Sequence, residues 1–254
     1  MILAFDIGNT NTVIGGFDGD ELSFVATVAT NLQKTSDEYA STLRGILSLH
    51  QIELEKIEGA IISSVVPPLN ATMKKALRVA LNIEALLVGP GVKTGLNIHC
   101  DVPSSVGSDL ICASAAASKI YGFPVLVIDM GTSTNIMAVD KKGTFIGVSI
   151  APGVNVSLKA LTENTAQLPQ ISLEAPRSVI GKNTADSMRS GVIFGTACML
   201  DGMIDRFNSE LGGSIKVIST GEFAESIVPH CQREITLDPY LTLKGLNLIY
   251  KKNN

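Results

Sequence analysis

The chain contains the same short pattern twice, once near residue 6 and again near residue 129. In each copy a buried strand ends in Asp-x-Gly and continues through a polar turn into a hairpin of strands. The first copy reads Asp6-Ile-Gly-Asn-Thr-Asn-Thr and the second reads Asp129-Met-Gly-Thr-Ser-Thr-Asn. This repeat predicts two similar domains that face each other across a cleft, residues 1–121 and residues 122–254, with the boundary near Tyr121.

The hydrophobic pattern predicts an α/β fold. Hairpin signals early in each half indicate antiparallel strands, and the later alternation of strand and helix indicates parallel ones, so we expect mixed sheets with helices on their faces. The strands are expected at 1–7, 12–18, 21–30, 59–66, 84–88, 125–130, 135–140, 144–150 and 215–219. The helices are expected at 36–49, 70–81, 108–120, 154–161, 184–210 and 238–250.

Composition excludes several classes of protein. With 254 residues, 45% hydrophobic and 17% charged, the chain can bury a sizeable core and does not resemble a disordered one. A net charge of −4 argues against nucleic-acid binding, and no apolar run is long enough for a membrane helix. The N-terminus lacks a signal-peptide pattern and the four cysteines form no Cys-x-x-Cys pair, so we expect a cytoplasmic protein with reduced thiols.

The chemistry of the Asp-x-Gly turns points to phosphate. Glycine lets the backbone turn sharply and approach a ligand, and backbone amides with Thr and Asn side chains can hold phosphate oxygens. A carboxylate at the end of a strand can orient a magnesium ion. A single turn of this kind is usually a plain hairpin. Two matching turns on opposite walls of a cleft would hold a nucleotide's phosphates from both sides.

Both turns resemble those of the superfamily that includes actin, hexokinase and acetate kinase, and the whole chain resembles the type III pantothenate kinases. Further motifs of that family occur in the expected order. They are Pro103-Ser-Ser-Val-Gly-Ser-Asp109, Ile150-Ala-Pro-Gly153, Thr165-Ala-Gln-Leu-Pro169, Ile180-Gly-Lys-Asn-Thr184 and Asp238-Pro-Tyr-Leu-Thr-Leu-Lys-Gly245. The resemblance implies duplicated ribonuclease-H-like (actin-like ATPase) domains, each with a mixed five-stranded sheet and flanking helices.

The resemblance also implies an activity, the ATP-dependent phosphorylation of pantothenate in the first step of coenzyme A biosynthesis. Family members are homodimers that use Mg²⁺ and a monovalent cation, K⁺ or NH₄⁺. The residues implied to hold ATP are Asp6, Ile7, Gly8, Asn9, Thr10, Asn11, Thr12 and Val13, with Thr132 on the opposite wall. Asp6 is the expected magnesium-side carboxylate, and Asp129 is the expected ligand of the monovalent cation.

Asp109 is implied to be the general base that accepts the proton of the pantothenate hydroxyl. A helix N-terminus should favour its charged form, and a plain role in complementing the helix end is the alternative. The implied substrate contacts are Cys100, Gly107, Ser108, Asp109, Leu110 and Thr184. For Thr184 the alternative is an N-cap of the helix behind it.

Three positions depart from the family pattern. Leu110 replaces an arginine, Cys100 replaces a tyrosine, and Glu222 replaces a glycine in the Thr-Gly-Gly motif near adenine. Because all three are expected ligand contacts, two other functions stay open. One is a kinase for a related small hydroxy-acid or amide, and the other is a non-catalytic relative that binds ligand without turnover.

Overall fold

A computed structural model describes residues 1–254 and divides the chain into two compact units. The first unit comprises Met1–Leu96, Val102–Ala116 and Leu241–Asn254, and the second comprises Asn97–Asp101 and Ala117–Tyr240. This division differs from a single boundary near Tyr121. The C-terminal helix α7 (Leu241–Asn253) packs against strands of the first unit, because its apolar residues complete the core there.

The sheet of the first unit has five strands, β1 (Ile2–Ile7), β2 (Asn11–Asp18), β3 (Glu21–Ala29), β4 (Gly59–Ser64) and β5 (Ala85–Leu87). Their spatial order is β3-β2-β1-β4-β5. The β1-β2-β3 hairpins are antiparallel, while β4 is parallel to both β1 and β5. The mixed five-stranded sheet that the resemblance implied is therefore present in this unit.

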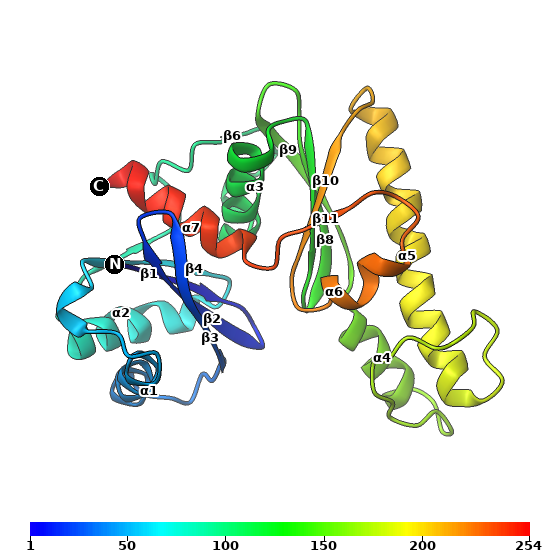
Figure 1. Ribbon diagram of the computed structural model, residues 1–254, viewed down its shortest axis with the longest axis horizontal. Helices are drawn as coiled ribbons and strands as arrows, with labels where there is room; N and C mark the ends of the chain where they lie inside the picture. Colours follow the sequence, from blue (N-terminus) through cyan, green and yellow to red (C-terminus); the bar gives the residue numbers. More distant parts are fainter. The chain divides into compact units, whose positions relative to one another are not determined.

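Helices cover both faces of this sheet (Figure 1). Alternate residues of β1, namely Leu3, Phe5 and Ile7, lie in a core cluster with α1 (Ser36–Leu49) and α2 (Pro67–Leu81). Ala4, which points the other way, lies in a cluster with α7 and with Cys112 of α3 (Ser108–Tyr121). Because successive side chains of a strand face opposite sides, Asp6 shares the face of Ala4 and thus of α3.

The second unit repeats this topology with one strand added. Its sheet has the order β11-β10-β7-β8-β9-β6, in which β9-β8-β7-β10-β11 corresponds to the five strands of the first sheet. The strands are β6 (Asn97–Ile98), β7 (Val125–Met130), β8 (Ser133–Val139), β9 (Thr144–Pro152), β10 (Lys216–Thr220) and β11 (Thr236–Leu237). The expected five strands become six because the segment before α3 pairs in parallel with β9.

Helices α4 (Val154–Glu163), α5 (Thr184–Glu210) and α6 (Ala224–Ile227) supply the core on one face of the second sheet. The β7 residues on that face are Leu126, Ile128 and Met130, which correspond to Leu3, Phe5 and Ile7 of β1. Asp129 therefore occupies the same position in its strand as Asp6 does in β1. The two halves match in fold as well as in sequence.

The elements that the sequence did not predict are all very short, and too few residues are present in each for a periodic signal. They include the two-residue strands β6 and β11 and the 3₁₀ turns η1 (Leu54–Lys56), η2 (Pro103–Ser105) and η3 (Val228–His230). Helix α7 begins at Leu241 and not at Asp238, whose side chain instead accepts a hydrogen bond from the Tyr240 amide. None of the helices combines the length and apolar content that crossing a bilayer requires.

Candidate functional site

The first Asp-x-Gly turn joins β1 to β2 through residues 8–11, between the paired residues Ile7 and Thr12. The Gly8 amide donates to the Asn11 carbonyl at 3.0 Å, and the Thr30 amide donates to the Thr10 carbonyl at 2.9 Å. Asn9 and Thr10 are exposed at the tip, whereas the Ile7 side chain is fully buried in the core. Ile7 can therefore contact a ligand only through its backbone, while the tip offers amides and polar side chains.

The second turn has the same construction with one residue fewer. Residues 131–133 join the paired residues Met130 and Thr134, and the Gly131 amide donates to the Ser133 carbonyl at 3.0 Å. The Gly153 amide donates to the Thr132 carbonyl at 3.1 Å, as Thr30 does to Thr10 in the first unit. Thr132 is thus the counterpart of Thr10.

The ungapped alignment of the two motifs is therefore wrong beyond the glycine. When the seven residues 6–12 are placed against residues 129–135 without a gap, Thr12 corresponds to Asn135. The strand register instead makes Thr12, the partner of Ile7, correspond to Thr134, the partner of Met130. Both threonine side chains are 1% exposed. The extra residue lies in the first turn, and no residue pattern there indicates a length difference.

The carboxylate of Asp129 lies against the turn that follows β10. A Cβ atom added to Gly221 would be 2.6 Å from Oδ1 of Asp129 and 2.6 Å from the Met130 amide nitrogen. Gly221 has a φ of +94°, a backbone conformation that side chains disfavour. Glycine at 221 is therefore required twice, by conformation and by the close approach of Asp129.

Asp109 lies in the first turn of α3. The Gly107 carbonyl accepts from the Ile111 amide at 3.2 Å, so Gly107 is the N-cap and no side chain caps this helix from that position. Oδ1 of Asp109 is buried without a hydrogen-bond partner. Burial raises the pKa of Asp109 above its ordinary value of 3.8, and the backbone amides of Leu110 and Asp109 counteract only part of that shift. The helix end alone does not set the protonation of this carboxyl group.

Asp6 and Asp109 are brought to the same side of the first unit. Both carboxylates raise the pKa of the Cys112 thiol, although burial of that thiol is the larger cause. Cys112 lies one helical turn after Asp109, on the face of α3 that packs against the sheet. Two of the predicted site residues from distant parts of the sequence thus share one environment.

Leu110 is 7% exposed, so its side chain is part of the interior. Cys100 follows β6 in the second unit and is half-buried. Burial raises the pKa of its thiol, and the neighbouring Asp101 adds to that effect. Glu222 is exposed, directly after Gly221.

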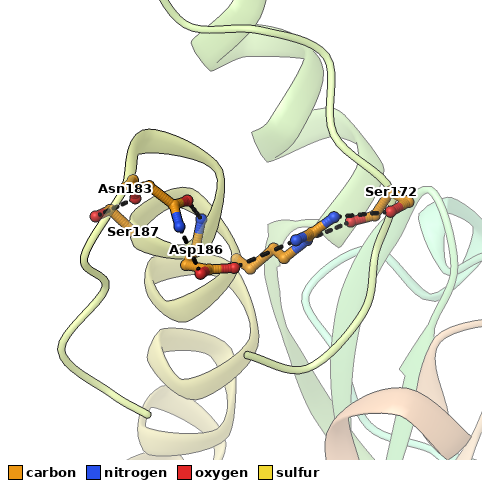
Figure 2. A network of polar contacts seen from close by, with 5 residues as sticks. Ser172, Asn183, Asp186 and Ser187 are labelled. Carbon is orange, nitrogen blue, oxygen red and sulfur yellow. Dashed lines mark hydrogen bonds and ion pairs between the residues drawn. The ribbon is translucent and has the colours of Figure 1, made fainter. Parts of the chain in front are cut away.

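Thr184 is the first residue of α5, and the N-cap is Asn183. Asn183 Oδ1 accepts from the Asp186 amide at 2.9 Å, and its Nδ2 donates to the Asp186 carboxylate at 2.8 Å (Figure 2). The alternative in which Thr184 is the N-cap is therefore wrong. The N-cap is the residue before it, Asn183, whose side chain accepts the hydrogen bond of the Asp186 amide at the start of α5. Thr184 itself is exposed.

The same network fixes the loop before α5. Arg189 donates through Nε to the Ser172 carbonyl at 3.1 Å and through Nη2 to the Ser172 hydroxyl at 3.0 Å. A Cβ on Gly181 would be 2.4 Å from the Ser187 amide nitrogen, so the loop can cross the helix there only with glycine. A cavity of about 500 Å³ lies beside this loop, with Arg177, Lys182 and Arg189 among its lining residues.

Several residues that support the site were not singled out by sequence reasoning. Gly221 and Gly153 lie against the second turn, since a Cβ on Gly153 would be 2.4 Å from the Gly131 carbonyl oxygen. Gly153 and Gly221 both stand in motifs noted in the sequence, which was the available signal. No sequence signal marked Ser63 and Ser64, which bond to Ser108 at the start of α3.

The fold defines the class first. The chain aligns over 99% of its length with a Baf family protein from Campylobacter jejuni, with a TM-score of 0.60 and 20% identity over 98% of that chain. It also aligns over 99% of its length with the activator of 2-hydroxyisocaproyl-CoA dehydratase from Clostridium difficile, with a TM-score of 0.55 and 10% identity over 95% of that chain. The two repeated mixed sheets with flanking helices have the architecture of the actin-like ATPase and sugar-kinase folds.

Sequence similarity then gives the family. Residues 2–206 match the family model described as type III pantothenate kinase. A type III pantothenate kinase from Halalkalibacterium halodurans is 41% identical over 253 residues, covering 100% of both chains. Those from an Exiguobacterium and a Geobacillus species are 40% and 39% identical over 253 residues, covering 100% of this chain and 99% and 98% of theirs. The chain belongs to the type III pantothenate kinase family.

Proposed function

We propose that this protein transfers the γ-phosphoryl group of ATP to the primary hydroxyl of pantothenate, forming 4'-phosphopantothenate in the first step of coenzyme A biosynthesis. The observation that carries the proposal is the pair of equivalent turns, with Thr10 and Thr132 held by the same kind of backbone bond in two matching sheets. In this proposal each turn presents amides and hydroxyls to phosphate oxygens of ATP.

Asp109 is the proposed general base. As the hydroxyl oxygen of pantothenate bonds to the γ-phosphorus, the bond from phosphorus to the bridging oxygen of ADP breaks, and Asp109 accepts the hydroxyl proton. The raised pKa and the unpartnered Oδ1 both support this role, because a carboxylate with a higher pKa is a stronger proton acceptor. In a loose transition state for phosphoryl transfer, the alignment of the hydroxyl matters as much as its deprotonation.

Asp6 is the proposed protein contact of Mg²⁺. The protein has no group of three or more His, Cys, Asp or Glu side chains suited to a metal ion. A magnesium ion held by one carboxylate, with phosphate oxygens and water as its other ligands, fits this chemistry. When bound, the ion neutralises charge on the transferred phosphate.

Asp129 is the proposed ligand of a monovalent cation, K⁺ or NH₄⁺. Its carboxylate is half-buried and lies against Gly221 at the end of β7, and a carboxylate is a suitable ligand for such a cation. The family resemblance also supports a homodimer in the cytoplasm, with Cys100, Gly107, Leu110 and Thr184 near pantothenate.

The test is a coupled assay of ADP release by purified protein with ATP, Mg²⁺ and K⁺. ADP should appear only when pantothenate is added, and mass spectrometry should find phosphopantothenate. Absence of pantothenate-dependent ADP at saturating ATP rejects the proposal. Calorimetry that finds ATP or pantothenate bound, without transfer, would indicate a non-catalytic binding protein instead.

A related small hydroxy-acid or amide is the second candidate acceptor, favoured by the apolar Leu110 at a position where the family has arginine. A panel of acceptors should rank pantothenate first if the main proposal holds. Leu110→Arg should lower the KM for pantothenate if position 110 faces its carboxylate, at some loss of stability because the side chain is 7% exposed. Leu110→Met is the matched control and should change neither KM nor stability greatly.

A further inference from the structure

The hydroxyl of Ser108 connects the start of α3 to the end of β4. Ser108 Oγ lies 2.9 Å from the hydroxyl of Ser63 and accepts from the Ser64 amide at 3.0 Å. It also lies 3.3 Å from the Ser64 carbonyl oxygen, to which it can donate. Ser63 is 0% exposed, while Ser64 and Ser108 are half-buried, so these contacts are partly shielded from solvent.

These contacts can use the full bonding capacity of the Ser108 hydroxyl. A hydroxyl has one proton to donate and two lone pairs to accept with. With Ser63 as donor, Ser108 Oγ accepts from Ser63 and from the Ser64 amide and donates to the Ser64 carbonyl. In that arrangement, no donor or acceptor of this side chain is left for a substrate.

The strand to which Ser108 is hydrogen-bonded, β4, pairs with β1, the strand that leads into the first Asp-x-Gly turn. In the parallel pair of β1 and β4, Ser63 is the partner of Asp6 and Ser64 is the partner of Ile7. The Val65 amide also donates to the Ile7 carbonyl at 3.1 Å. The bonds of Ser108 therefore join the helix that carries Asp109 to the sheet position that carries Asp6.

We propose that Ser108 is a positioning residue, whose hydroxyl fixes the start of α3 to the end of β4 and so holds Asp109 in place relative to the first turn. This inference rests on the proposed function, in which Asp109 is the base. It assigns the hydroxyl of Ser108, a residue expected among the substrate contacts, to the anchoring of α3. The N-cap of α3 is Gly107, which has no side chain that could bond to the helix end. The Ser108 hydroxyl, one residue later, bonds this end of the helix to β4 instead.

The kinetic test is Ser108→Ala, assayed with ATP and pantothenate. Displacing a reacting group by about 1 Å can cost up to about 10²-fold in rate. We expect kcat to fall roughly 10- to 100-fold while KM for ATP and for pantothenate stays within about twofold. An increase in KM for pantothenate at unchanged kcat would show that Ser108 touches the substrate and would overturn the proposal.

Two further variants separate positioning from general effects of the substitution. Ser118→Ala removes another hydroxyl of α3, one that is buried without a hydrogen-bond partner, and should leave kcat unchanged. Ser108→Thr keeps the hydroxyl and should retain kcat within about threefold of the unmodified protein. Equal losses of kcat in Ser118→Ala and Ser108→Ala would contradict the inference.

Amide hydrogen exchange tests the bonds of Ser108 without any activity. The Ser64 amide should be protected like its neighbours in β4, and in Ser108→Ala its exchange should accelerate roughly tenfold through loss of its acceptor. Exchange of Ser64 at the rate of an exposed loop in the unmodified protein would overturn the proposal even if Ser108→Ala does not fold. An unmodified protein that does not phosphorylate pantothenate rejects the proposed function alone, since the exchange result still decides whether Ser108 fixes α3.

Discussion

A Cβ atom placed on Gly107 would lie 2.4 Å from Oδ1 of Asp109. The proposed base therefore folds back over the glycine two residues before it, and any side chain at 107 must displace the carboxylate. The carboxylate of Asp109 can therefore occupy this position only if residue 107 is a glycine.

Gly107→Ala should consequently lower kcat by about 10- to 100-fold, because the methyl group pushes Asp109 out of line. Steady-state kinetics with pantothenate measure this effect. Gly45→Ala in α1 is the control, since its added Cβ meets nothing within 4 Å. That variant should leave kcat unchanged and stabilise the protein by about 0.5–1 kcal/mol. Unchanged kcat in Gly107→Ala would show that Asp109 does not need this geometry.

Asp109→Asn should reduce phosphoryl transfer by about 10²- to 10⁴-fold while preserving the fold. It should also raise Tm at pH 7. The folded-state pKa of Asp109 lies above 3.8, so the ionised carboxylate is disfavoured by folding. The stability linked to this shift is present below pH 3.8 and is lost as pH rises through the folded-state pKa, so the Tm advantage of asparagine should vanish in acid.

Asp37→Asn provides the matched control, because Asp37 occupies the same position in the first turn of α1 but is exposed. That substitution should lower stability by about 0.3–1 kcal/mol at pH 7 through loss of a favourable charge at the helix end. Thermal unfolding at pH 7 should therefore move in opposite directions for the two variants. A fall in Tm for Asp109→Asn at pH 7 would contradict the raised pKa.

Gly221→Ala should impair the second turn. Its φ of +94° and the approach of Asp129 Oδ1 both oppose a side chain. Gly213→Ala isolates the backbone effect, since Gly213 has a φ of +85° and open space around its Cβ. Both variants should lose about 1 kcal/mol of stability from the backbone conformation, but only Gly221→Ala should also lose its dependence of kcat on K⁺. A K⁺ titration identical in both variants would remove Asp129 from the proposed cation site.

The two equivalent threonines should respond differently to the loss of a hydroxyl. Thr12 Oγ1 shares a hydrogen bond of 2.9 Å with Thr30 Oγ1, whereas Thr134 Oγ1 is buried without a partner. Thr12→Val should therefore cost about 0.5–1.5 kcal/mol of unfolding free energy, and Thr134→Val should be neutral or stabilising. Urea unfolding measures both values. Equal destabilisation of the two variants would disprove the difference in hydrogen bonding.

The elements with strong periodic patterns were predictable from the sequence. The helix expected at 36–49 is α1 (Ser36–Leu49), because Thr35 and Glu38 form a capping box that marks its start. The helix expected at 184–210 is α5. The strands β6 and β11 were missed because two residues carry no pattern, and they exist only where a neighbouring strand edge is available.

For the candidate site, the sequence supplies residue types and the structure supplies their geometry. Motifs in the sequence predict roles for Asp6, Asp109 and Asp129, and the family resemblance predicts Ser108 among the substrate contacts. The structure instead turns the Ser108 hydroxyl to β4, a strand more than forty residues earlier in the chain. Local sequence cannot specify such a bond, because it depends on which strand end meets the helix.

By itself, the sequence determined that the chain is duplicated, that each half begins with a buried strand and a polar turn, and which family it belongs to. These properties follow from local patterns of apolar residues, glycines and polar residues. Only the tertiary structure decided that the first turn is one residue longer, that α7 returns to the first sheet, and that burial raises the pKa of Asp109. Strand register, helix packing and desolvation arise from contacts between segments far apart in the chain, so no local pattern could contain them.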